Sequence, residues 1–363
     1  MRDPRIVKFA EVLVNYSVDM KKGETLLVSA PPAAEPLVKE VYRAALVRGA
    51  HVLVRMAGEE LDEIYYATAS DEELDYLSPI VMFEAEHTDA RIVISAATNT
   101  RGLSGIDPKR QARRARTVKP MRDIILNKIR WCGTLFPTAA YAQDADMSLA
   151  RYEDFVFGAV FADREDAIGE WRKLSARQAR LIAWLKGRKT VRITGAGTDL
   201  SFSLEGRTWV NSDGKHNMPS GEIFTTPVEG SVNGEITFSY PAIHGGREVE
   251  GVRLVFRNGA VAEAHAKKNE DYLRQMIASD AGAKIPGEFG VGTNSSISRF
   301  TKSILCDEKI GGTIHIALGE SYAETGGLNK SALHWDMICD LRKGGEIIVD
   351  NEVFEKDGKF VIS

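Results

Sequence analysis

The stretch TLLVSAPPAAEPLVKEVYRAALVRGAHVLVRM, residues 25–56, decides the fold of the first half of the chain. Two short runs of aliphatic and β-branched residues, Thr25–Ser29 and His51–Met56, are typical of buried strands. Between them, Glu35–Arg48 carries apolar residues at helical spacing, which places these residues on one side of a helix. A strand, a helix and a second strand in this order predict a right-handed crossover between parallel strands.

The same pattern continues to about residue 188. The apolar runs Arg91–Ser95 and Trp131–Phe136 predict two more strands, and Arg164–Gly187 predicts one long helix. We therefore expect residues 1–188 to form an α/β domain with a mostly parallel sheet and Rossmann-like layering. Neither a G-x-G-x-x-G motif nor a P-loop follows the first strand, so this domain is not expected to bind a nucleotide.

From residue 189 onward the sequence alternates in the manner of antiparallel strands. The segment VRITGAGTDLSFSLEGRTWV is interrupted by turn residues, and Asn258-Gly259 and Asp357-Gly358 are strong hairpin signals between apolar runs. We expect residues 189–363 to form an α+β domain rich in antiparallel strands.

Composition limits the classes of partner. The chain has 363 residues and a formal net charge of -4, which disfavours nucleic acid as a partner. The basic run Lys109–Arg116 is interpreted as a solvated helix face.

Three cysteines without close spacing argue against a disulfide framework and a structural zinc site. The N-terminus does not resemble a secretory signal, and the longest apolar runs are too short to span a membrane, so we expect a cytoplasmic protein with no membrane partner.

Residue types that bind metals concentrate in the second half. His334 and Asp336 stand two apart, and on an extended segment their side chains would share a face. His315 lies in the strand-like run TIHIALG, residues 313–319, where a buried core histidine is the competing interpretation. Tyr322 follows seven residues later and would either contact a metal or substrate, or pack as an amphipathic side chain.

Two Gly-Glu pairs and a third acid add carboxylates. Glu222 and Glu288 each follow a glycine and precede apolar residues, and an enclosed carboxylate needs a cation or several hydrogen-bond donors. Glu308 precedes His315, whereas its neighbours Asp307 and Lys309 are interpreted as an exposed turn. Together these residues exceed the ligands of one catalytic zinc, so we expect two divalent ions, chosen from zinc, cobalt, manganese and magnesium, sharing a bridging carboxylate.

Six ordered motifs resemble the two-metal aminopeptidases of the aminopeptidase T and aminopeptidase S type. They are PTAAYAQDADMSLARYEDF, MPSGEIFTTP, GEITFSYPAIHGGREVEGVRLVFRNGAV, SDAGAKIPGEFGVGTN, LCDEKIGGTIHIALGESY and NKSALHWDM. The resemblance implies a metal-site set of seven residues: Glu222, Glu288, Glu308, His315, Tyr322, His334 and Asp336. The loop between Glu308 and His315 is longer than in bacterial members, and the loop between Tyr322 and His334 is short.

The resemblance also implies a function. A metal-activated water would cleave the N-terminal peptide bond of short peptides, with Glu308 as proton shuttle and Tyr322 near the oxyanion. Members of the family form a dimer that encloses an inner cavity, so a homodimer is expected. We expect Glu288 to bridge the ions.

Two other functions are kept as alternatives. A ring-cleaving dioxygenase of the dihydroxypyridine type would bind one ferrous ion through His315, His334 and Asp336. A peptide-binding protein without catalysis would bind no metal. The additional glutamates distinguish the peptidase, because a single iron does not need them.

Overall fold

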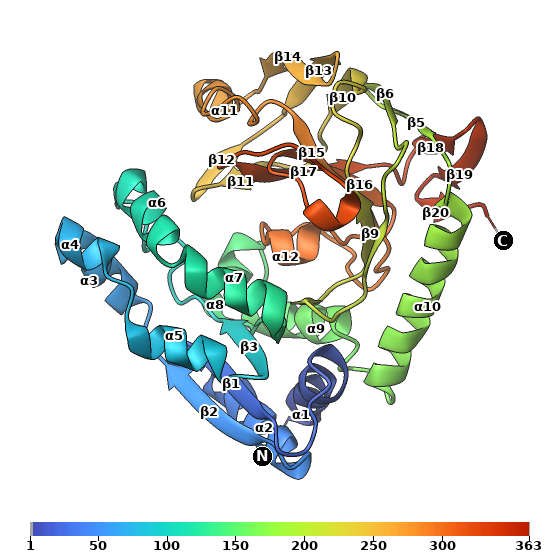
Figure 1. The fold of residues 1–363 in the computed structure, drawn as a ribbon. Coiled ribbons are helices and arrows are strands. Elements are labelled where there is room, and N and C mark those ends of the chain that lie inside the picture. The colour runs from blue at the N-terminus through green and yellow to red at the C-terminus, as the bar shows by residue number, and fades with distance from the viewer. Residues whose placement is uncertain (1–2, 363) are drawn as a thin grey trace. The chain divides into compact units, whose positions relative to one another are not determined.

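The structure is a computed structural model in which residues 3–362 are described (Figure 1). Contacts between Cα atoms divide the chain into two compact units. The first contains the chain up to Trp171 together with Gly214–Pro219, and the second contains Arg172–Asp213 and the chain from Ser220 onward. The helix α10 (Ala167–Leu185) therefore lies mainly in the second unit, whereas the sequence places the boundary near residue 188.

The first unit is built on a five-stranded sheet in the order β2-β1-β3-β4-β8, and all its strand pairs are parallel. The four strands predicted in this half are confirmed. The fifth strand comes from the distant segment that returns to this unit, and it was not predicted. The strands are β1 (Thr25–Ala30), β2 (His51–Met56), β3 (Ala90–Ser95), β4 (Arg130–Leu135) and β8 (Asn217–Met218).

The helices next to this sheet form two groups (Figure 1). One group includes α1, α2 and α9, and the other includes α5, α6 and α7. The predicted helix after the first strand is observed as α2, whose buried face includes Leu37, Val38 and Val41. The helices are α1 (Pro4–Val12), a π-helical turn η1 (Leu13–Ser17), a 3₁₀ turn η2 (Pro32–Ala34), α2 (Glu35–Val47), α3 (Glu60–Thr68), α4 (Asp71–Asp75), α5 (Pro79–Glu86), α6 (Pro108–Thr117), α7 (Lys119–Lys128), α8 (Ala139–Asp144) and α9 (Leu149–Ala159).

The basic run on α6 is only partly solvated. Arg110 Nε donates to the carbonyl of Tyr66 at 2.7 Å, and Arg114 Nη1 donates to the carbonyl of Tyr76 at 2.6 Å. Arg113 pairs with Asp75. The arginines therefore hold the α3–α4 segment, which explains a cluster of basic residues in an acidic protein better than a fully solvated face does.

The second unit contains two larger antiparallel sheets and one short hairpin. The eight-stranded sheet B runs β14-β13-β10-β6-β5-β18-β19-β20, and the five-stranded sheet C runs β17-β16-β15-β9-β7. The predicted turns at Asn258-Gly259 and Asp357-Gly358 are confirmed, because all four residues have positive φ and join paired strands. The α/β architecture and the antiparallel β-rich architecture that the sequence predicts are both present.

The strands of sheet B are β5 (Thr190–Gly195), β6 (Thr198–Ser203), β10 (Asn233–Thr237), β13 (Arg253–Arg257), β14 (Ala260–His265), β18 (Glu346–Val349), β19 (Glu352–Lys356) and β20 (Lys359–Phe360). Those of sheet C are β7 (Val210–Ser212), β9 (Glu222–Thr225), β15 (Pro286–Gly292), β16 (Thr313–Gly319) and β17 (His334–Asp340). The hairpin pairs β11 (Ala242–His244) with β12 (Arg247–Val249), and the helical segments are α10, α11 (Glu270–Ile277), α12 (Ile304–Asp307) and the 3₁₀ turn η3 (Ala323–Thr325).

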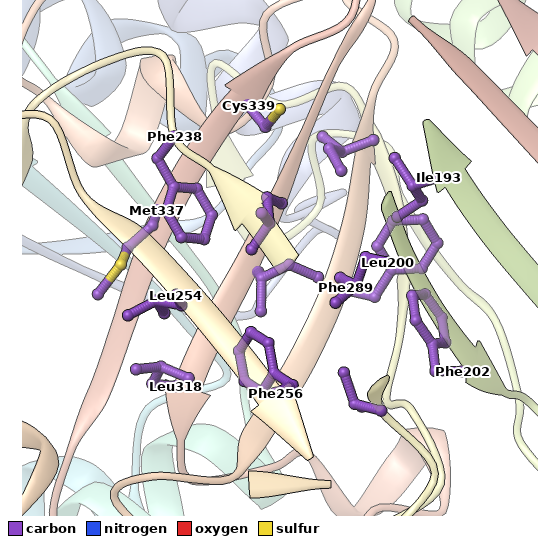
Figure 2. Close-up of a cluster of buried hydrophobic side chains, with 14 of the residues drawn as sticks. Ile193, Leu200, Phe202, Phe238, Leu254, Phe256, Phe289, Leu318, Met337 and Cys339 are labelled. Atoms are coloured by element: carbon purple, nitrogen blue, oxygen red, sulfur yellow. The ribbon is translucent and has the colours of Figure 1, made fainter. Parts of the chain in front are cut away.

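Side chains from sheets B and C form the hydrophobic core of the second unit. Figure 2 shows Leu200 of sheet B near Phe289 of sheet C, and Leu254 of sheet B near Leu318 and Met337 of sheet C. Burial of this apolar surface is the main favourable contribution to folding. Sheet C is therefore anchored through one face, which leaves its other face for a different purpose. Among residues 3–362, no helix is long and apolar enough to cross a membrane.

Glu355 on β19 is an exception in this otherwise apolar region. The residue is 1% exposed, and within the described part of the chain neither carboxylate oxygen has a hydrogen-bond partner. Burial raises the pKa of Glu355 to about 8. The folded protein therefore holds this proton more tightly than the unfolded chain does, and the free energy of unfolding must fall as the pH rises from the ordinary glutamate range toward 8.

We predict that Glu355→Leu raises the free energy of unfolding by on the order of 2 kcal/mol at pH 9, because it removes an uncompensated buried carboxylate. The gain should be smaller at pH 6, where the wild-type group is protonated. Urea unfolding at both pH values measures it, with Glu352→Leu on the same strand as an exposed control. A gain that is the same at both pH values would show that Glu355 does not titrate abnormally.

Candidate metal centre

Sheet C has two chemically different faces. Successive side chains of a strand point to opposite faces, so Phe289 and Val291 on β15 face the core while Glu288 and Gly290 face away from it. The same alternation on β17 sends Trp335, Met337 and Cys339 into the core. Glu222, Glu288, His315, His334 and Asp336 all belong to the face opposite the core.

Cross-strand pairing brings these side chains into neighbouring rows. Ala317 on β16 pairs with Glu288 on one side and with Asp336 on the other, so the two acids lie in one row. The adjacent rows pair His315 with Gly290, and Gly319 with His334. Small residues therefore alternate with the polar ones, which gives the long side chains room to converge.

The position of the His315 ring leaves room only for a glycine at residue 290. A Cβ atom at position 290 would lie 2.0 Å from Cε1 of the imidazole, which is far inside van der Waals contact. Gly221 has a comparable role before Glu222, because its φ is +119° and a Cβ there would lie 2.6 Å from Cβ of Asn294. The Gly-Glu signal in the sequence thus has a backbone explanation at position 221.

Glu288 lies at the centre of the site. Its Oε1 is 3.3 Å from Nε2 of His315, and its Oε2 is 3.4 Å from Nε2 of His334. Glu222 Oε2 is 3.5 Å from Nε2 of His315, and Asp336 Oδ2 is 3.5 Å from Nε2 of His334. One carboxylate therefore contacts two separate His–carboxylate pairs, one through each of its oxygens.

Three groups of potential ligands have atoms within 4.8 Å of one another. Glu308, at the C-cap of α12, joins the sheet residues in one of them. Glu288, His315 and Asp336 each belong to two groups, so the groups form one continuous cluster. The groups are Glu222–Glu288–His315, Glu288–His334–Asp336 and Glu308–His315–Asp336.

The donor set fits divalent cations. Among residues 3–362, Glu222 Oε2, Asp336 Oδ1 and His315 Nδ1 are buried without a hydrogen-bond partner. Leaving such atoms unpaired is costly, and a cation would compensate the two carboxylate oxygens. Nδ1 of His334 lies 3.0 Å from the carbonyl oxygen of Glu320, which can only accept. Nδ1 must therefore carry the hydrogen, so in the neutral imidazole the lone pair is on Nε2.

The negative charge of the surrounding carboxylates perturbs the histidines. Burial alone would lower the pKa of His315, but Glu288, Glu222 and Asp336 outweigh it and raise the pKa to about 10. Burial likewise opposes protonation of His334, yet Asp336 and Glu288 raise its pKa to about 12. Protons and a divalent cation would therefore compete for the same imidazole nitrogens.

The pKa values of Glu308 and Asp336 are shifted in opposite directions by this environment. Burial raises the pKa of Glu308 to about 8, although Lys309 partly opposes the shift. Burial would also raise the pKa of Asp336, but His334, His315 and Lys309 lower it to about 2. Glu308 can thus exchange a proton near neutral pH.

Tyr322 lies beside the cluster, just before the turn η3. Its ring centroid is 5.3 Å from that of His334 and 5.5 Å from that of Phe224. Burial and the carboxylates of the site raise the pKa of its phenol. The phenol is therefore protonated and can donate a hydrogen bond.

The interpretation of Asp307 and Lys309 as an exposed turn was wrong. Asp307 is 1% exposed and accepts hydrogen bonds from the backbone NH and the hydroxyl of Thr301. Lys309 is 0% exposed, and its Nζ lies 3.0 Å from Oε1 of Glu222 and in contact with Glu308. The apolar neighbours Cys306 and Ile310 were the available signal that this segment is buried.

We predict that Gly290→Ala weakens the binding of divalent ions at least about 10-fold, because the added methyl group must displace the His315 ring. Calorimetric titration of the metal-free protein with Zn²⁺ measures the effect. Gly195→Ala on β5 is the matched control, since a Cβ there makes only ordinary contact, 3.6 Å from Leu341. Equal affinities in the two variants would contradict the proposed need for space at Gly290.

Comparison with known proteins agrees with this chemistry. A family model described as thermophilic metalloprotease (M29) matches residues 2–360. Aminopeptidase 2 of Geobacillus stearothermophilus is 28% identical, covering 97% of this chain and 94% of its own. Aminopeptidase T of Thermus thermophilus is 27% identical, covering 87% and 85%. The solved structure of wild-type AmpT from Thermus thermophilus has the same fold, with a TM-score of 0.86, 24% identity and 99% coverage of both chains. The chain belongs to the thermophilic metalloprotease (M29) family.

Proposed function

We propose that this chain is a metal-dependent aminopeptidase that removes N-terminal residues from short peptides with a metal-activated water. The observation that carries the proposal is the central position of Glu288, which presents one oxygen to each of two His–carboxylate pairs. The family supplies the metal dependence, and the relatives compared above are named aminopeptidases.

We propose two divalent ions, chosen from zinc, cobalt, manganese and magnesium. Glu222, Glu288 and His315 would hold one, and Glu288, His334 and Asp336 would hold the other. Such ions supply Lewis acidity toward a peptide carbonyl and lower the pKa of water. Mixed oxygen and nitrogen ligands suit these metals, and the family supports a metal site without fixing its identity.

Glu308 is proposed to transfer the proton. Its carboxylate would take a proton from the attacking water, whose oxygen bonds to the carbonyl carbon, and would pass that proton to the leaving nitrogen as the C–N bond breaks. A pKa raised to about 8 by burial allows both steps near neutral pH. The Tyr322 phenol would stabilise the oxyanion by donating a hydrogen bond. Its inclusion among the metal ligands remains a proposal from the resemblance.

The rival functions are less compatible with the site. A mononuclear iron site would need His315, His334 and Asp336 around one ion, but no ligand group within residues 3–362 contains both histidines. A purely peptide-binding protein would not require acids and imidazoles collected on one face of a sheet. The family match also favours the hydrolase over both alternatives.

We further propose a cytoplasmic homodimer whose enclosed cavity admits short peptides. This part rests on the resemblance to two-domain aminopeptidases, and analytical ultracentrifugation tests the association state.

The function is tested by the release of free amino acids from short peptides after metal removal and after metal add-back. Glu288→Gln should lower turnover by at least about 1000-fold and reduce bound metal, because it removes the shared negative ligand. Glu263→Gln, an exposed acid of the same unit, is the control. N-acetylated peptides should remain intact, and their cleavage at the rate of free peptides would contradict the exopeptidase assignment.

Protons and divalent ions should compete for the imidazoles of the site. Because the pKa values of His315 and His334 are raised when no ion is bound, ion binding must release protons, and apparent affinity must rise with pH. Activity should fall on acidification together with metal loss, and excess divalent ion should restore it.

Turnover against pH at two Zn²⁺ concentrations measures this effect. His334→Ala should abolish the rescue. Asp336→Asn should weaken binding with a shallower pH dependence, because without this carboxylate the pKa of His334 is raised less and protons compete less strongly. His265→Ala, an exposed histidine, is the control. Acid limbs that coincide at low and high Zn²⁺ would show that the limiting group is not a metal ligand.

A further inference from the structure

Lys309 introduces a fixed positive charge into the candidate metal centre. Its side chain is fully buried, and its ammonium contacts two carboxylates, Glu222 and Glu308. Both acids belong to potential ligand groups, Glu222 with Glu288 and His315, and Glu308 with His315 and Asp336. The lysine therefore contacts Glu222, the acid that the ion proposed on this side of the cluster would also use.

The backbone keeps Lys309 in this place. Its NH donates to the carbonyl of Cys306 at 3.1 Å, and its carbonyl accepts from the NH of Asn294 at 3.2 Å. The next residue, Ile310, is buried and forms a β-bridge with Asn294. The buried stem gives the ammonium no route to solvent, so the positive charge stays beside Glu222 and Glu308.

The other side of the cluster differs. Glu288, His334 and Asp336 form a complete ligand group, and the ion-pair contacts of Lys309 in residues 3–362 go to Glu222 and Glu308 instead. A divalent ion at this second group would face two carboxylates without an ammonium bound to them. An ion coordinated by Glu222 would instead share that acid with Lys309, and like charges at short range in a buried site repel strongly.

We infer that the Lys309 ammonium competes with one of the two divalent ions for Glu222, so that the centre holds one ion tightly and the other weakly. The inference rests on the proposed two-ion function and adds an order of binding to it. The tight ion belongs to Glu288, His334 and Asp336, and the exchangeable ion belongs to the side of Glu222. Full activity then requires a higher free-ion concentration than the first binding event does.

The test is calorimetric titration of the metal-free protein with Zn²⁺, combined with metal content by mass spectrometry after dialysis. The wild type should show two classes of site that differ at least about 10-fold in affinity and should retain about one ion after dialysis. Lys309→Met, an unbranched neutral side chain of similar length, should strengthen the weaker site about 10- to 100-fold and retain two ions. Lys302→Met, which removes an ion pair with Glu248 elsewhere in this unit, is the matched control and should behave as wild type.

The possible results distinguish a failure of the inference from a failure of the proposed function. Two equally tight ions in a wild-type protein that hydrolyses peptides would overturn the inference alone. A protein that binds no Zn²⁺ and releases no amino acids would overturn the proposed function as well. If Lys309→Met does not fold without metal, the wild-type titration still tests the inference. It shows, without any substitution, whether the protein has one class of Zn²⁺ site or two. Unchanged affinities in a folded Lys309→Met would also overturn the inference.

Discussion

Mutual repulsion among buried acids is the constraint on which the site depends. Glu222, Glu288, Glu308 and Asp336 lie close enough to share cations, and Glu222 and Glu288 are almost fully withdrawn from water. Such a cluster can persist only if positive charge accompanies it. Protonated imidazoles, a buried ammonium and divalent ions can all provide that charge. The perturbed pKa values of the histidines and the burial of Lys309 are consequences of one charge imbalance.

The two faces of sheet C make this imbalance tolerable. The free energy gained by packing Phe289, Leu318 and Met337 against sheet B holds the strands in register. The same register then fixes the polar side chains on the opposite face. Because the side-chain period is two residues, a slip of one residue would move Glu288 into the core and Phe289 into the cluster. The apolar core therefore specifies the geometry of the charged site.

Local patterns in the sequence predicted what local physics determines. Runs such as Thr25–Ser29 predicted parallel strands, Asn258-Gly259 predicted a hairpin, and the spacing of His334 and Asp336 predicted a shared face. Long-range packing determined what was missed. The strand β8 joins the parallel sheet of the first unit from the second half of the sequence, and no local pattern contains its partner β4. The seven site residues came from the resemblance together with residue type, and their assignment as ligands remains a prediction.

Lys309 shows why charged residues are the hardest to place from sequence. An Asp-Glu-Lys run has the composition of a solvated turn. Burying an ammonium costs free energy, so that interpretation is reasonable for most such runs. Here the cost is offset by carboxylates from distant strands, since Glu222 precedes Lys309 by 87 residues. An acid cluster assembled by the fold thus reverses the usual preference of a nearby lysine for water. The same attraction that buries Lys309 brings its charge to bear on any cation that the acids bind.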